Sequence, residues 1–146
     1  MDIVQLVQSA KESGNFEAIL DQLPYARLLG VQMKEDDKNG LMFVLPFQVH
    51  NIGNDRLPAL HGGVISGFME TAAMLHLLWM RESAEIPRTV DFSVDYLRSG
   101  KADTLYARCS ITKQGKRIAN VQMTAWQDDR EIPVAAARAH FLLTEG

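Results

Sequence analysis

The sequence contains a single cysteine, Cys109, among its 146 residues. One cysteine excludes an intramolecular disulfide and favours a reducing, cytoplasmic location. Its place in an alternating apolar run predicts a packed thiol rather than a nucleophile. The chain has no excess of basic residues: its net charge of −3 argues against bulk electrostatic binding to nucleic acid or an anionic membrane. After Met1 we find no basic flank and apolar run of the kind that forms a signal peptide.

Motifs for metals and nucleotides are missing as well. The four histidines, at positions 50, 61, 76 and 140, do not have the spacing of metal ligands, so we expect no metal site. Neither a P-loop nor a dinucleotide-binding glycine pattern occurs. The composition, with 47 % apolar and 23 % charged residues, is that of an ordinary globular protein. The length predicts one domain over residues 1–146.

Apolar periodicity predicts where helices and strands lie. Two short helices are expected at residues 3–13 and 16–23, the second stopping at Pro24. We interpret residues 1–25 as a helical extension that caps the fold or contacts another subunit. From residue 29 the period changes to two, which predicts strands separated by turns and by one loop over residues 49–60. The expected strands cover residues 29–36, 41–48, 88–98, 104–113, 117–127 and 132–143.

The most apolar stretch, residues 62–80, lies between the second and third expected strands. It is long enough to cross a membrane, but Glu70 near its centre would be costly in a bilayer. A helix that is apolar nearly all round must be enclosed by protein. An antiparallel sheet that curls around one helix would enclose it. The sequence therefore predicts an α+β hotdog fold, in which the sheet wraps around a long central helix.

Glu70 is the only charged side chain in that stretch. An ionised carboxylate in a buried helix is costly unless it is paired, hydrogen-bonded or exposed to a wet cleft. One interpretation is a structural ion pair with an arginine such as Arg138. The other is a general base or nucleophile whose pKa is set by partial burial.

A glycine turn, His61-Gly62-Gly63, stands at the start of the helix. Glycines let backbone N–H groups approach a ligand closely, and the first turn of a helix has unpaired donors at its positive end. Together they can hold a developing oxyanion. A simpler interpretation is that the glycines only permit a tight turn. For His61 two interpretations stay open: it takes part in catalysis, or it only orients the backbone or caps the helix.

The turn followed by Glu70, nine residues after the histidine, resembles the helix start of hotdog-fold acyl-CoA thioesterases, in particular the phenylacetate-pathway (PaaI-like) group. The resemblance covers about residues 25–143. It also includes an asparagine upstream of the turn, the run from Thr89 to Leu97 in the third expected strand, and the Gln114-Gly-Lys-Arg turn. It implies hydrolysis of an acyl-CoA, with CoA as part of the substrate and no separate cofactor.

The resemblance also implies roles for individual residues. The backbone at Gly62 and Gly63 would bind the thioester carbonyl, and Glu70 would activate water or attack the carbonyl directly. Asn51, or Asn54 in its place, would position the water or the thioester. The site would be shared across a homodimer interface, with the glycine turn and the carboxylate from different subunits, and such dimers commonly pair into tetramers.

Thr89 stands where the family often has a Ser or Thr near the nucleophile. Residues 1–80 carry 5 basic and 9 acidic side chains, net −4, whereas residues 81–146 carry 10 and 9, net +1. The mildly basic later part is either a set of solvated strand faces or the place where the CoA phosphates are held. The candidates for those phosphates are Arg98, Lys101, Lys116 and Arg117.

Three further expectations concern the substrate and the reaction. The acyl group would lie in an apolar pocket at the subunit interface, against Phe68, Met69 and Met74. A hydratase or dehydratase acting on acyl thioesters is an alternative within the same fold, since His50 precedes the helix, although it lies twenty residues from Glu70. The alternative that is not an enzyme is a protein that binds acyl-CoA without catalysing a reaction.

Overall fold

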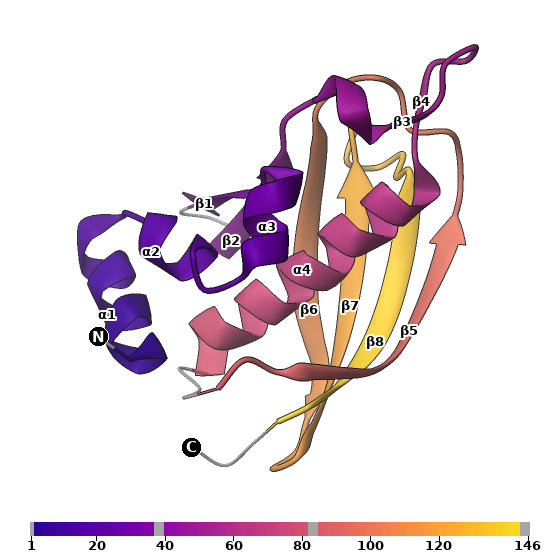
Figure 1. The fold of residues 1–146 in the computed structure, drawn as a ribbon. Helices are drawn as coiled ribbons and strands as arrows, with labels where there is room; N and C mark the ends of the chain where they lie inside the picture. Colours follow the sequence, from indigo (N-terminus) through magenta and orange to yellow (C-terminus); the bar gives the residue numbers. More distant parts are fainter. Residues whose placement is uncertain (1, 37–39, 82–84, 144–146) are drawn as a thin grey trace.

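The computed structural model describes residues 2–36, 40–81 and 85–143. Its centre is a six-stranded antiparallel sheet that curves along one face of the long helix α4 (Gly62–Arg81), as Figure 1 shows. The strand order across the sheet is β1-β2-β6-β7-β8-β5. The predicted α+β hotdog architecture is confirmed. The strands are β1 (Gln32–Asp36), β2 (Gly40–Leu45), β5 (Arg88–Tyr96), β6 (Leu105–Gln114), β7 (Ile118–Trp126) and β8 (Ala135–Leu142).

The strands bury every second side chain, and the buried face of the sheet packs against α4. Along β8, Ala135, Ala137 and Phe141 are buried, while Arg138 between them is exposed. The small alanines let α4 lie close to the strand, and larger apolar side chains from the other strands fill the rest of the core. Helix α4 is apolar and long enough to span a membrane, but 61 % of its most apolar window is buried inside the protein. It is the core helix of this fold.

The N-terminal helices differ from the prediction at one boundary. Helix α1 (Ile3–Ser13) is confirmed, but the second predicted helix is only α2 (Glu17–Leu20). Pro24 does not end a helix; it begins α3 (Pro24–Leu29), because proline at the first helical position loses no hydrogen bond and has a suitable φ. Helix α3 ends at Gly30, whose φ is 83°, so β1 starts at residue 32 rather than 29.

This helical extension covers the far end of α4. Trp79, near the end of α4, has the Phe16 ring at a centroid distance of 5.2 Å and the Lys11 ammonium 5.2 Å from its ring centroid. Tyr25 on α3 packs over Gly67, in the second turn of α4. Of the two interpretations of residues 1–25, the cap is therefore the one that the contacts within this chain support.

The segment predicted as a loop over residues 49–60 is more ordered than expected. It contains a 3-10 turn, η1 (Val49–Asn51), and a two-stranded ribbon of β3 (Ile52–Asn54) and β4 (Ala59–Leu60). Strands of three and two residues are too short to show period-two patterning, and turn formers such as Asp55 and Pro58 lie between them. The ribbon leads directly into α4 at the top of Figure 1. The sequence Lys38-Asn39-Gly40 also predicts a turn between the first two strands, and its residues 38 and 39 lie outside the described residues.

Candidate active site

Glu70 lies on the one face of α4 that the sheet and the N-terminal helices leave partly open. The half-buried or exposed positions along this face recur every three or four residues, the spacing of one helix face. They are Gly63, Ser66, Gly67, Glu70 and Met74. None of the described residues forms a hydrogen bond or ion pair with the Glu70 carboxylate. The carboxylate is therefore available to water or to a ligand.

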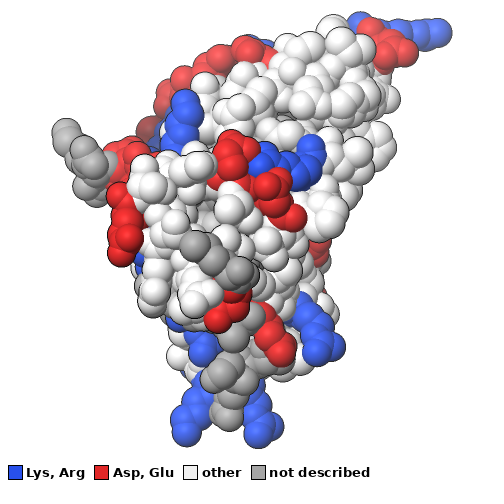
Figure 2. Space-filling view, turned by 60° about the vertical axis from the view of Figure 1, so that its left-hand side comes forward, with Lys and Arg blue, Asp and Glu red and all other residues white. Residues whose placement is uncertain are grey.

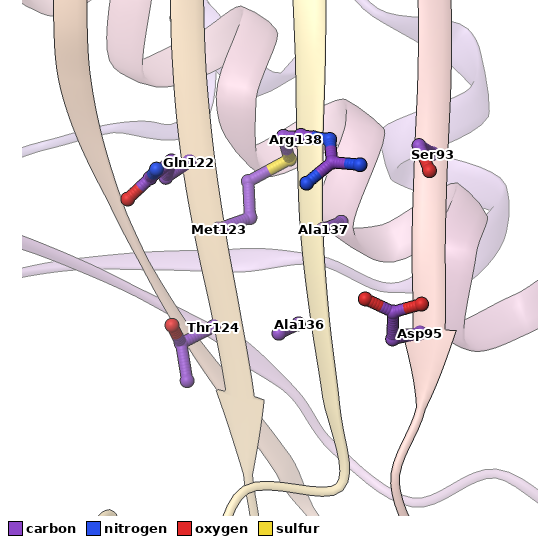
Figure 3. A pocket seen from close by; sticks show the side chains of 8 residues that line it. All are labelled: Ser93, Asp95, Gln122, Met123, Thr124, Ala136, Ala137 and Arg138. Carbon is purple, nitrogen blue, oxygen red and sulfur yellow. The ribbon is translucent and has the colours of Figure 1, made fainter.

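An ion pair between Glu70 and Arg138, one of the two interpretations above, is wrong. Arg138 is exposed on the face of β8 that points away from α4, because neighbouring strand residues alternate between the two faces. Figure 3 shows it on that outer face, near Asp95 of β5, with α4 behind the strands. Arg138 and Asp95 line a hollow of about 230 Å³ on this outer face, and the sheet lies between the hollow and Glu70.

His61 caps the start of α4, as one of its two interpretations predicts, and its catalytic role stays a prediction. Its Nδ1 atom accepts a hydrogen bond from the Gly63 N–H at 2.8 Å, which requires the neutral imidazole with its proton on Nε2. Its own backbone N–H donates to the Asn51 carbonyl at 2.9 Å. The Gly63 N–H is thus already used, whereas no described residue accepts a hydrogen bond from the Gly62 N–H. Of the two predicted donors, Gly62 is the free one.

The structure distinguishes the two candidate asparagines. Asn51 is buried at 2 % exposure, and its Nδ2 atom has no hydrogen-bond partner among the described residues. Asn54 is exposed, and its side-chain oxygen accepts from the Arg56 N–H at 3.0 Å, which closes the tip of the β3–β4 ribbon. A buried unpaired amide is costly and calls for a ligand or water. The geometry therefore favours Asn51, which is joined to His61 through the backbone.

Thr89 also carries a buried polar atom, Oγ1, without a partner among the described residues. It is the second residue of β5, an edge strand of the sheet, whereas Tyr96 at the other end of β5 contacts Gly62. Seven residues of extended strand span about 23 Å. Within one chain, Thr89 and the glycine turn are therefore far apart.

The four basic candidates fall into two pairs at opposite ends of β6. Arg98 and Lys101 line a pocket of about 300 Å³, where Lys101 pairs with Asp128 at 3.2 Å. Lys116 and Arg117 lie in the β6–β7 turn, about 30 Å away along the strand. Figure 2 shows basic side chains scattered over the visible face and not gathered into one patch. Of the four, only Arg98 and Lys101 lie near the start of α4: Arg98 lines a pocket with Gly62, and Lys101 forms a β-bridge with Ala59.

A sequence model described as the thioesterase superfamily matches residues 57–134, more than half of the chain. The chain belongs to the thioesterase superfamily. This confirms the prediction of a thioester hydrolase, and the matched region contains both the glycine turn and Glu70.

Several relatives of this thioesterase are known by sequence or structure. The medium/long-chain acyl-CoA thioesterase YigI of Escherichia coli K12 is 25 % identical over 140 residues, which cover 87 % of this chain and 90 % of YigI. A crystal structure from Chromobacterium violaceum is 55 % identical, covers 97 % of this chain and 98 % of its own, and has a TM-score of 0.78. A Bacillus halodurans protein crystallised with CoA is 19 % identical, with a TM-score of 0.73 over 99 % of this chain and 92 % of its own. At that identity the last shows the fold alone.

The predicted acyl-group contacts need correction. Phe68 and Met69 of this thioesterase are fully buried in the core, on the side of α4 that faces the sheet, so they do not line an open pocket. Met74 is the only one of the three on the open face of α4. Cys109 packs against the core, and burial raises the pKa of its thiol, which agrees with the prediction of an inert, packed cysteine.

The sequence pattern did not identify a pocket of about 370 Å³ beside the glycine turn. Its lining includes Gly62, Ile65, Tyr96 and Leu97. Tyr96 is half exposed and donates its hydroxyl hydrogen to the Gly62 carbonyl at 2.8 Å. In the sequence, Tyr96 is simply one more apolar residue of an alternating strand, so nothing there indicated a link to residue 62.

We expect Gly53→Ala, a change in β3, to destabilise the neighbouring His61-Gly62-Gly63 turn. A Cβ atom at Gly53 would lie 2.7 Å from the His61 Cα atom, and backbone cannot move aside as a side-chain end can. The overpacking should lower the free energy of unfolding by roughly 1–3 kcal/mol. Chemical denaturation would measure it. Gly115→Ala is the matched control, because its Cβ would meet only the Ile118 carbonyl oxygen at 3.6 Å. Equal stability of the two variants would contradict the expectation.

Proposed function

We propose that this thioesterase hydrolyses acyl-CoA to a free acid and CoA. The observation that carries the proposal is the unpaired, half-buried Glu70 carboxylate on the open face of an otherwise apolar helix in a thioesterase fold. The similarity to YigI, named as an acyl-CoA thioesterase, supports CoA as the thiol part of the substrate. We further propose membership of the phenylacetate-pathway (PaaI-like) group and a cytoplasmic location, both of which rest on the sequence.

In the proposed reaction, the Gly62 N–H binds the thioester carbonyl oxygen and stabilises the negative charge that develops there. Glu70 then acts by one of two routes. As a general base, it takes a proton from a water molecule that attacks the carbonyl carbon. The C–S bond then breaks, and the departing CoA thiolate takes that proton from Glu70 to leave as the thiol. As a nucleophile, its carboxylate displaces CoA to form a mixed anhydride, which water then hydrolyses. Asn51 would orient the water or the thioester in both routes.

The spacing of these groups supports a site built from two subunits. Gly62 and Glu70 are eight residues apart on one helix, which is about 12 Å along its axis. The free N–H points outward from the start of the helix, so a carbonyl bound there lies still farther from the Glu70 carboxylate of the same chain. We therefore propose a homodimer, or a dimer of dimers, in which the glycine turn of one subunit faces the Glu70 face of the other.

A panel of acyl-CoA substrates tests the proposed function. Saturated acyl-CoAs from C2 to C18 and an aryl-acetyl-CoA are incubated with the protein, and the released CoA thiol is measured. We expect turnover with at least one acyl class. Hydration of an enoyl-CoA without thiol release would instead support the hydratase, although His50 and Glu70 form no hydrogen bond or ion pair with each other in the described part of the chain. Thermal stabilisation by acyl-CoA without turnover would support a binding protein.

A further inference from the structure

The peptide group between Gly62 and Gly63 is held from both sides. Its carbonyl oxygen accepts the hydroxyl hydrogen of Tyr96 at 2.8 Å. Its N–H donates to Nδ1 of His61, also at 2.8 Å. The Ser66 hydroxyl adds a longer bond to the same carbonyl, at 3.1 Å, from one turn farther along α4. Of these partners, only Tyr96 comes from outside the helix and its cap.

Tyr96 also contacts the turn through its ring. A Cβ atom at Gly62 would lie 3.4 Å from both Cζ and Oη of Tyr96, so the ring edge rests against the glycine. Tyr96 ends β5, which is 34 residues farther along the chain and belongs to the edge of the sheet. The contact therefore fixes the start of α4 relative to the sheet.

A contact that fixes the start of α4 matters because the Gly62-Gly63 turn would otherwise be free to move. Two consecutive glycines have more backbone freedom than any other pair, and the first turn of a helix frays readily. An oxyanion-binding donor is effective only if it is held in position before the substrate arrives. The N–H and the carbonyl of Gly62 share one Cα atom, so a fixed carbonyl limits the directions in which the N–H can point.

We propose that Tyr96 is a positioning residue of this thioesterase. By donating to the Gly62 carbonyl, its hydroxyl holds the first turn of α4 so that the Gly62 N–H is aimed at the thioester carbonyl. The hydroxyl acts through the backbone and not on the substrate, because its hydrogen is already used. The expected effect on catalysis rests on the proposed function. The hydrogen bond from Tyr96 to Gly62 is present in the folded chain whatever its activity.

The test compares Tyr96→Phe with Tyr106→Phe. The first variant loses only the hydroxyl and keeps the ring beside Gly62. The second loses the same group from a ring that stacks on Trp126, at a centroid distance of 6.0 Å. Two quantities are measured: steady-state kcat and KM for the acyl-CoA that turns over best, and the hydrogen-exchange rate of the Gly63 amide by NMR.

We expect Tyr96→Phe to lower kcat by roughly three- to tenfold, the effect of one lost hydrogen bond, with KM nearly unchanged. The Gly63 amide should exchange faster by a similar factor, and Tyr106→Phe should change neither quantity. A raised KM at constant kcat would overturn the proposal, because it would make Tyr96 a substrate contact. Unchanged Gly63 exchange would overturn it as well. If the wild-type protein hydrolyses no acyl-CoA, the proposed function fails, and the exchange measurement alone still decides whether Tyr96 holds the turn.

Discussion

Glu70→Gln is expected to lower kcat for acyl-CoA hydrolysis by roughly 10²- to 10⁴-fold, the range that a general base contributes. Glutamine has nearly the same shape as glutamate, but its amide neither takes a proton from water at neutral pH nor attacks a thioester. Glu70 has no ion pair or hydrogen bond to a described residue, so the change breaks no contact. The free energy of unfolding should therefore stay the same or rise slightly.

The matched control is Glu12→Gln, which removes the same charge from an exposed position on α1. It should leave kcat and KM at wild-type values. Thermal unfolding of both variants shows whether the fold is intact. If Glu70→Gln folds normally and keeps more than about a tenth of the wild-type kcat, Glu70 is neither base nor nucleophile and the mechanism is wrong.

The same residue shows which features the sequence could predict. Glu70 could be identified from the sequence because a charge is rare in an apolar helix, and that rarity does not depend on the tertiary structure. The start of α4 could be predicted for a similar reason, since two glycines directly precede an apolar run. The sheet followed from period-two patterning, which indicates a buried face whatever the strand order.

Other features depend on contacts that leave no local pattern. Pro24 is compatible both with the end of one helix and with the start of the next, and only packing against α4 decides between them. The bond from Tyr96 to Gly62 joins residues 34 positions apart. The sequence predicted one phosphate-binding group from Arg98, Lys101, Lys116 and Arg117. A count of charges does not show that β6 separates the first two residues from the last two.

Gly62→Pro is expected to lower kcat by roughly 10²- to 10³-fold, the effect of removing one oxyanion donor. Gly62 is the first residue of α4, where proline is well tolerated because its missing N–H has no partner within the helix. The substitution thus removes the free N–H and keeps the helix start. Gly62→Ala is the control: it keeps the N–H, and its Cβ would make an ordinary contact with Tyr96 at 3.4 Å. Equal losses in both variants would mean that crowding, rather than the lost donor, lowers kcat.

The Gly62→Pro and Glu70→Gln chains together test whether the site spans two subunits. Each variant alone forms homodimers in which both sites are damaged. In a heterodimer, one site combines the intact Gly62 turn of the Glu70→Gln chain with the intact Glu70 of the Gly62→Pro chain, and the other site carries both changes. Co-expression with two affinity tags, followed by sequential purification, isolates this species. We expect it to regain about half of the wild-type activity, because one of two equivalent sites is restored. A heterodimer as inactive as its parents would place Gly62 and Glu70 of the same chain in one site, which the separation of about 12 Å along α4 argues against.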